Sequence, residues 1–201
     1  MGSLQLAVVR FSERFTVMGG SFAGWIDRVL AKPIRYLFET PGRLLKDYVK
    51  HGMTVLDVGC GEGYYSLGMA KLVRREGRVI AIDAQVEVIA NLRRKAEKAG
   101  LSERIETRVC SEEDLGIRNL SGQVDFALAV YVIHHAKDAG SLMSDVHRAL
   151  KPGGNLLVVE PGHHASAAER EATETAARTA GFALAEYPRL KRDWAVAFVK
   201  G

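Results

Sequence analysis

The sequence predicts an α/β protein with a Rossmann-like, doubly wound sheet of seven mostly parallel strands and an antiparallel last strand. From about Pro41 onward, short apolar runs typical of buried strands alternate with amphipathic segments typical of helices. Glycines follow the first apolar run in the stretch MTVLDVGCGEG, residues 53–63, where such folds bind nucleotide-like ligands. The last two runs flank a turn at Pro188, so we expect a hairpin that reverses the final strand.

The first elements are indicated by apolar spacing and by proline or glycine at their ends. Pro41 favours a helix start, and the apolar residues after it give that helix one buried side. The next helices carry apolar residues three and four positions apart, and Gly100 ends the last of them. In chain order we expect a helix from Pro41 to about Val49, a strand over 54–58, a helix over 64–75, a strand over 79–82, a helix over 85–99 and a strand over 104–109.

The later elements follow the same alternation. Residues 124–131 are nearly all apolar, which is typical of a central strand that is covered on both faces. Residues 151–154, KPGG, predict a turn into the next strand, and Gly181 predicts the end of the last helix. We expect strands over 124–131, 155–159, 182–187 and 194–199, and helices over 141–150 and 165–180.

Residues 1–40 are expected to form a basic, aromatic helical extension in front of the main domain, residues 41–201. Up to Lys50 the chain holds eight Lys or Arg against four Asp or Glu, together with seven of its fifteen aromatic residues. The extension would either pack its aromatic side chains on the main domain or act as a lid that favours anionic or flat apolar substrates. The charge surplus is too small to favour a membrane-surface role.

The composition indicates a soluble cytoplasmic protein. No apolar run is long enough to cross a bilayer, so we expect no stable membrane insertion, and the N-terminus lacks a signal-peptide pattern. Cys60 and Cys110 make neither a disulfide framework nor a zinc-type spacing. The histidine pairs at 134–135 and 163–164 lack an acidic or cysteine partner, so we expect no metal.

Gly59, Gly61 and Gly63 should form the ligand-binding turn between the first strand and the helix after it. Glycine allows positive φ and lets a ligand approach the backbone closely. Tyr64 stands where a dinucleotide-binding GxGxxG pattern needs its third glycine. Asp57 places a carboxylate before the turn, which would repel a pyrophosphate and attract an ammonium or sulfonium group. The turn therefore favours a cationic amino-acid nucleoside over a dinucleotide.

Four motifs in this order resemble those of the class I S-adenosylmethionine-dependent methyltransferases. They are VLDVGCGEGYYS at 55–66, VIAIDA at 79–84, VDFALAVYVIHHAKD at 124–138 and LKPGG at 150–154. The resemblance runs from about Pro41 to the C-terminus. It implies S-adenosylmethionine as the methyl donor, S-adenosylhomocysteine as the product, and in-line transfer to an O, N, S or C nucleophile of a small molecule.

The resemblance implies that Gly59, Gly61 and Gly63 pass under the methionine part of the cofactor. Asp57 would steer the ammonium group of that methionine. Cys60 belongs to the same cofactor-binding turn, where its small size suits it and a reactive thiol is not expected. The plainer alternative for Asp57 is that it caps the following helix or holds the turn.

At the nucleoside end, the resemblance implies that Asp83 accepts hydrogen bonds from both ribose hydroxyls and that Ala84 lies under the adenine edge. The loop 110–115 should line the adenine. An aspartate often stands at the position of Ser111 in this family, so either Ser111 binds the adenine more weakly or Glu112 substitutes. The plainer alternatives are a strand-end turn residue for Asp83 and solvated loop positions for Ser111 and Glu112.

Tyr131, His134 and His135 follow the fourth strand and are the candidates to act on the acceptor, with Tyr131 also a candidate to contact the cofactor. A histidine can take a proton near neutral pH, which is needed only if the acceptor stays protonated. The alternative is that both histidines are structural, at the start of the next helix.

Other functions stay open beside this one. A nucleotide-dependent oxidoreductase is disfavoured by Asp57 and Tyr64, and a cofactor-binding module without turnover would fit the departure at Ser111. A nucleic-acid substrate is not expected, because no Asn/Asp-Pro-Pro-Tyr tetrad follows the fourth strand and the chain from His51 onward has no net charge. The sequence does not set the oligomeric state, so a homodimer stays open.

Overall fold

The computed structural model describes residues 41–111, 113–162 and 165–201. The expected helical extension over 1–40, Glu112 and the histidine pair 163–164 lie outside these residues. The elements of the described part are α3 (Pro41–Leu45), β1 (Thr54–Val58), α4 (Tyr64–Val73), β2 (Arg78–Asp83), α5 (Val86–Lys98), η1 (Ser102–Arg104), β3 (Ile105–Val109), η2 (Arg118–Leu120), β4 (Val124–Val130), η3 (Ile133–His135), α6 (Ala139–Ala149), β5 (Leu150–Pro161), α7 (Ala167–Thr179), β6 (Phe182–Glu186) and β7 (Asp193–Lys200).

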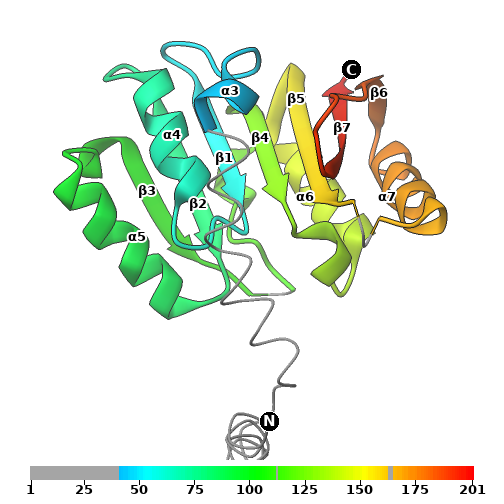
Figure 1. Ribbon diagram of the computed structural model, residues 1–201, viewed down its shortest axis with the longest axis horizontal. Helices are drawn as coiled ribbons and strands as arrows, with labels where there is room; N and C mark the ends of the chain where they lie inside the picture. The colour runs from blue at the N-terminus through cyan, green and yellow to red at the C-terminus, as the bar shows by residue number, and fades with distance from the viewer. Residues whose placement is uncertain (1–40, 112, 163–164) are drawn as a thin grey trace, which may run out of the picture. The chain divides into compact units, whose positions relative to one another are not determined.

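The strands form a seven-stranded sheet in the order β3-β2-β1-β4-β5-β7-β6 (Figure 1). Pairing is parallel from β3 through to β5, whereas β7 runs antiparallel to both β5 and β6. The predicted fold class, including the reversed last strand, is confirmed. The chain order reverses between β1 and β4, and at such a reversal the carboxyl ends of parallel strands open a crevice for ligands.

Helices cover both faces of the sheet, and each face has its own apolar core. Alternate residues of β1 supply the two cores: Val55 belongs to the core under α3, α4 and α5, and Leu56 to the core under α6 and α7. Met69 of α4 and Val146 of α6 are fully buried in these two cores. This two-sided packing explains why β1, β2 and β4 read as continuous apolar runs.

Two helices end earlier than the sequence predicts. The helix that begins at Pro41 ends at Leu45, four residues before Val49. Helix α4 ends at Val73 because Arg74 adopts a left-handed φ of 60°, which no helix continues.

None of the helices in the described ranges combines the length and the apolar character that crossing a membrane would need.

Strand β5 is longer than expected and contains the KPGG segment. Leu150 pairs with Val124, and the next paired residue, Asn155, faces Phe126, so the segment bulges out of an otherwise continuous ladder. The expected turn is therefore a bulge inside the strand. At its other end β5 runs on to Pro161, so Glu160 lies at the edge of the sheet where the parallel strands end.

Candidate functional site

The glycine turn after β1 has the left-handed backbone that its sequence predicts. Gly59, Gly61 and Gly63 have φ values of 65°, 51° and 83°. A Cβ added at Gly59 would lie 2.4 Å from Val132 Cγ2, and one added at Gly63 would lie 2.1 Å from Leu92 Cδ1, so packing within the protein already requires both glycines. A Cβ added at Gly61 would meet no atom within 4 Å. Gly61 thus presents bare backbone to open space, as a ligand-binding turn requires.

Asp57 is buried beneath this turn and caps helix α4. Its side chain is 2% exposed, and its carboxylate accepts hydrogen bonds from the hydroxyl and the backbone N–H of Ser66. Ser66 lies in the first turn of α4. The N-cap of this helix is Gly63, which has no side chain that could accept a hydrogen bond from the first turn. Burial raises the pKa of Asp57 to about 7, while the hydrogen bonds from Ser66 oppose this rise. The geometry matches the helix-capping alternative for this residue.

Asp83 ends β2 and binds the glycine turn directly. One carboxylate oxygen accepts from the N–H of Gly61 at 2.9 Å, and the other accepts from the N–H of Gln85 at 2.9 Å. Each carboxylate oxygen has a second lone pair, so both can still accept from a ligand. The structure therefore brings Asp83 and Gly61 together at the carboxyl ends of β1 and β2.

Other residues that the sequence assigned to the cofactor lie around this turn. Cys60 donates its N–H to Ile82 O at 2.9 Å, and burial raises the pKa of its thiol above the ordinary range. Ala84 is exposed beside Asp83. Ser111 follows Cys110, whose N–H donates to Asp83 O at 3.1 Å, and the Ser111 hydroxyl accepts from Asp114 N at 3.0 Å. Glu112 lies outside the described residues.

Tyr131 stands directly after β4 with a left-handed φ of 59°, which is uncommon for a residue other than glycine. Its N–H donates to Val159 O at 2.8 Å, so the ladder with β5 holds it in place. This backbone reversal carries the chain from β4 into η3. Backbone strain of this kind persists where the surrounding structure fixes it, often beside a functional site.

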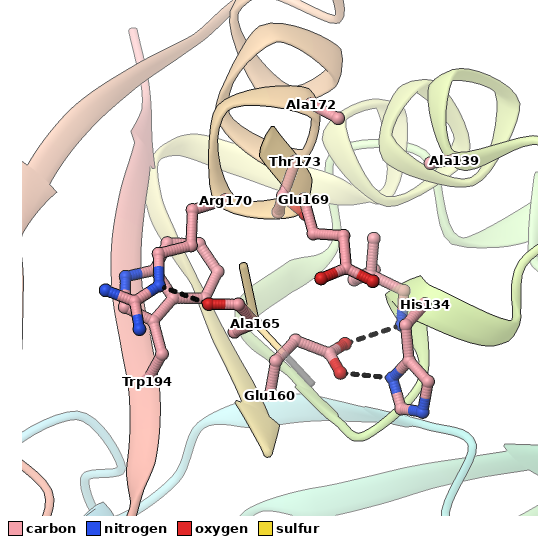
Figure 2. A pocket seen from close by; sticks show the side chains of 10 residues that line it. His134, Ala139, Glu160, Ala165, Glu169, Arg170, Ala172, Thr173 and Trp194 are labelled. Atoms are coloured by element: carbon pink, nitrogen blue, oxygen red, sulfur yellow. Dashed lines mark hydrogen bonds and ion pairs between the residues drawn. The ribbon is translucent and has the colours of Figure 1, made fainter. Parts of the chain in front are cut away.

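Glu160 is the residue that sequence reasoning missed. It stands near the end of β5, is 4% exposed, and accepts from the N–H of Ile133 at 2.8 Å with one oxygen and from His134 Nδ1 with the other (Figure 2). Both partners belong to η3, so one buried carboxylate fixes the turn after β4 and the orientation of an imidazole. The signal was present in the sequence as an acid that ends a buried strand, the same signal that pointed to Asp83.

The Glu160–His134 pair has the arrangement of a carboxylate that orients a histidine. Burial raises the pKa of Glu160, and the adjacent imidazole opposes that rise. The His134 side chain remains 22% exposed, and its ring lies 3.8 Å from that of His135, centroid to centroid. A carboxylate that binds Nδ1 leaves Nε2 as the ring nitrogen that exchanges protons, and it stabilises the imidazolium. His134 can therefore serve as a general base.

No metal centre is found in the part of the chain that the structure describes: no three His, Cys, Asp or Glu side chains there come together as metal ligands would. The Glu160–His134 pair brings two such side chains together, whereas a metal site of the kind sought has at least three.

A family model described as "Methyltransferase domain" matches residues 49–194. The ubiquinone biosynthesis O-methyltransferase of Xanthomonas oryzae pv. oryzae is 35% identical over 132 residues, which cover 63% of this chain and 51% of that protein. The human mitochondrial ubiquinone biosynthesis O-methyltransferase is 34% identical over 108 residues, which cover 53% of this chain and 28% of that protein. The chain thus spans about half or less of the length of these curated relatives.

Solved structures with the same fold cover more of the chain. A SAM-dependent methyltransferase from Aquifex aeolicus superposes with a TM-score of 0.73 and 26% identity, covering 82% of this chain and 91% of that one. A geranyl diphosphate C-methyltransferase from Streptomyces coelicolor A3(2), in complex with S-adenosyl-L-homocysteine, has a TM-score of 0.68 at 14% identity, covering 80% of this chain and 75% of that one. The second likeness shows the fold alone.

Proposed function

Because the chain belongs to the class I S-adenosylmethionine-dependent methyltransferases, we propose that it transfers a methyl group from S-adenosylmethionine to a hydroxyl oxygen of a small molecule. The curated relatives named as O-methyltransferases support oxygen as the acceptor atom. The observation that carries the proposal is the buried Glu160 carboxylate, which orients His134 at the end of β4. A hydroxyl acceptor is protonated at neutral pH and needs such a base.

The residues around the glycine turn fit the cofactor. Gly61 offers open backbone on its Cβ side, so the methionine part of the cofactor would lie against it. Asp83 retains lone pairs for the ribose hydroxyls while its backbone contacts fix its position. Ala84 and the loop with Ser111 would form the adenine end, and Asp57 would act from beneath the turn. When bound, the cofactor supplies a methyl group on a sulfonium, which is already a good electrophile.

The chain's own contribution would be to orient the acceptor and move one proton. The acceptor hydroxyl gives its proton to Nε2 of His134, and its oxygen lone pair then faces the methyl group in line with the bond that breaks. Glu160 stabilises the imidazolium that forms, and its bond to the N–H of Ile133 keeps the turn in place. His135, whose ring lies beside that of His134, and Tyr131, which follows β4, would help to position the acceptor.

Two measurements test this proposal. Calorimetry with S-adenosylhomocysteine and with NAD should give binding of the first and none of the second. Incubation with S-adenosylmethionine and a panel of catechols should then give O-methylated products by mass spectrometry. Binding of NAD instead of S-adenosylhomocysteine would support the oxidoreductase alternative. Binding of S-adenosylhomocysteine without any transfer to a hydroxyl would favour a binding module.

A further inference from the structure

A cavity of about 190 Å³ is lined by Glu160 and lies between η3, the beginning of α6, helix α7 and the beginning of β7 (Figure 2). All four of these segments, with the end of β5, meet at the edge of the sheet where the parallel strands end. The residues that line the cavity are Ile133, His134, Ala139, Glu160, Ala165, Glu169, Arg170, Ala172, Thr173 and Trp194. His134 is the one residue of this lining to which the sequence assigned a role.

The size of the cavity suits one aromatic ring. An apolar cavity of ~150 Å³ is large enough to take benzene. Trp194 provides an indole surface on one side, and three alanines and Ile133 keep much of the remaining wall small and apolar. A flat ring fits such a wall better than a flexible chain does, because contact between two aromatic rings, edge-on or stacked, adds to the apolar burial.

Two carboxylates set the polar character of the cavity. Glu160 reaches it from β5, and Glu169 reaches it from the first turn of α7, where one of its oxygens accepts from Ser166 N at 2.8 Å (Figure 2). Ionised carboxylates accept hydrogen bonds and repel anions. The cavity therefore favours a ring that carries hydrogen-bond donors and disfavours one that carries a carboxylate.

Arg170 brings one positive charge to the wall of the cavity, which does not balance the two carboxylates. Its Nε donates to Ala165 O at 2.8 Å, and its guanidinium carbon lies 5.8 Å from the centre of the Trp194 ring. Both contacts hold the side chain against the wall, where it positions the indole. Figure 2 shows the guanidinium beside Trp194 and Ala165, on the side of the cavity away from His134.

The cavity is joined to the glycine turn through consecutive residues. Val132 lies against Gly59, and the next two residues, Ile133 and His134, line the cavity. A ring held in the cavity would thus lie beside His134, on the turn that also packs against the glycine turn.

We propose that this cavity is the acceptor subsite and that it takes a single uncharged aromatic ring with hydroxyl groups, with Glu169 selecting against a ring that carries a carboxylate. This inference rests on the proposed methyl transfer and names its substrate class. It assigns Trp194 to ring stacking and Glu169 to charge selection, roles independent of the cofactor.

Trp194 itself can report the occupancy of the cavity. The chain has two tryptophans, Trp25 and Trp194, so a Trp25→Phe variant leaves the cavity residue as the sole indole fluorophore. Two probes of nearly equal size separate charge from shape: 3,4-dihydroxybenzamide is neutral at pH 7, and 3,4-dihydroxybenzoate is an anion. Each is titrated with and without saturating S-adenosylhomocysteine while the fluorescence is followed.

The benzamide should bind about tenfold more tightly than the benzoate, a difference that one like-charge contact of modest strength supplies. Glu169→Gln should bring the two affinities within about threefold of each other, mainly by strengthening the binding of the benzoate. Glu171→Gln, on the same helix but not lining the cavity, is the matched control and should preserve the tenfold ratio. Ala172→Phe should block both probes while S-adenosylhomocysteine still binds.

Equal affinities for the two probes, a ratio that Glu169→Gln leaves unchanged, or no binding of either probe would each overturn the inference. Its failure is distinct from failure of the proposed function. S-adenosylhomocysteine that binds by calorimetry while neither probe reaches Trp194 refutes the subsite alone. Probes that bind while S-adenosylhomocysteine does not refute the methyl transfer and leave the cavity as a ring-binding site.

Discussion

The hydroxyl of Ser66 donates a hydrogen bond to the carboxylate of Asp57, and this contact joins the strand before the glycine turn to the helix after it. Gly63 begins the helix with backbone alone, so the cap comes from a residue nine positions before Ser66 along the chain. The glycine turn can thereby keep an open surface without leaving the end of α4 unsatisfied.

Asp57→Asn should change how stability depends on pH. The folded protein raises the pKa of Asp57 to about 7, so it holds a proton that the unfolded chain releases near pH 4. This stabilisation is present below about pH 4 and is lost as the pH rises to about 7, at roughly 1.4 kcal/mol for each pH unit. Asparagine carries no charge, so the variant should gain stability over the wild type at pH 8 and gain little at pH 4.5. Urea denaturation at both pH values measures the difference.

The same variant separates the two roles of Asp57. A residue that only caps α4 would tolerate asparagine, since its amide oxygen still accepts from Ser66. A residue that also steers the ammonium group should lose about tenfold or more in affinity for S-adenosylhomocysteine. Unchanged affinity together with the expected gain in stability at pH 8 would assign Asp57 to capping alone.

Gly61→Ala and Gly63→Ala should fail in different ways. Alanine at 61 meets no neighbour, so it should cost about 1 kcal/mol of stability from its positive φ alone. It should also strongly weaken the binding of S-adenosylhomocysteine. Alanine at 63 carries the same backbone cost and also drives a Cβ into Leu92, so its loss of stability should be clearly larger. Thermal denaturation and calorimetry on both proteins test this, and equal losses of stability would contradict the open space beside Gly61.

Glu160→Gln should lower kcat by about 100-fold while the affinity for S-adenosylhomocysteine stays within twofold or so. Glutamine can still accept from the N–H of Ile133, so the turn should keep its shape, but it cannot stabilise an imidazolium as a carboxylate does. Glu160→Ala, which also removes the bond to Ile133, should lose stability as well. A Glu160→Gln enzyme that keeps the wild-type kcat would show that the pair is structural.

Cys60 should resist alkylation in the native protein. Burial raises the pKa of its thiol well above the ordinary range, so little of the reactive thiolate forms at pH 8. Cys110 is half-buried, and its thiol pKa is also raised, so it should react first but slowly. Iodoacetamide labelling followed by peptide mass spectrometry gives the order. Faster labelling of Cys60 than of Cys110 would contradict the packing of the glycine turn.

Much of the fold and of the glycine turn could be predicted because their signals in the sequence are local. The glycines after β1, the acid that ends β2 and the apolar run of β4 each lie within a few residues of the structure they specify. The structure adds that Gly59 and Gly63 are required by packing, whereas Gly61 is left open. That distinction depends on Val132 and Leu92, whose contacts with the turn no local pattern reveals.

The contacts of Glu160 and Trp194 were harder to predict because they join distant segments. Glu160 binds residues 27 and 26 positions earlier in the chain, and Trp194 reaches the same cavity from a strand still further on. The left-handed φ of Tyr131 could not be expected either, since nothing in its residue type favours it. His134 and His135 lie beyond β4 as expected, but the carboxylate that orients His134 was not predicted.

Because β7 runs antiparallel to β5, its first residues lie near the candidate site and its last residues lie far from it. Running opposite to β5, this strand begins beside Pro161 and leads away, so that Gly201 emerges at the far rim of the sheet (Figure 1). A purification tag or a partner domain fused after Gly201 would therefore start on the side of the sheet away from the glycine turn and the cavity beside Glu160.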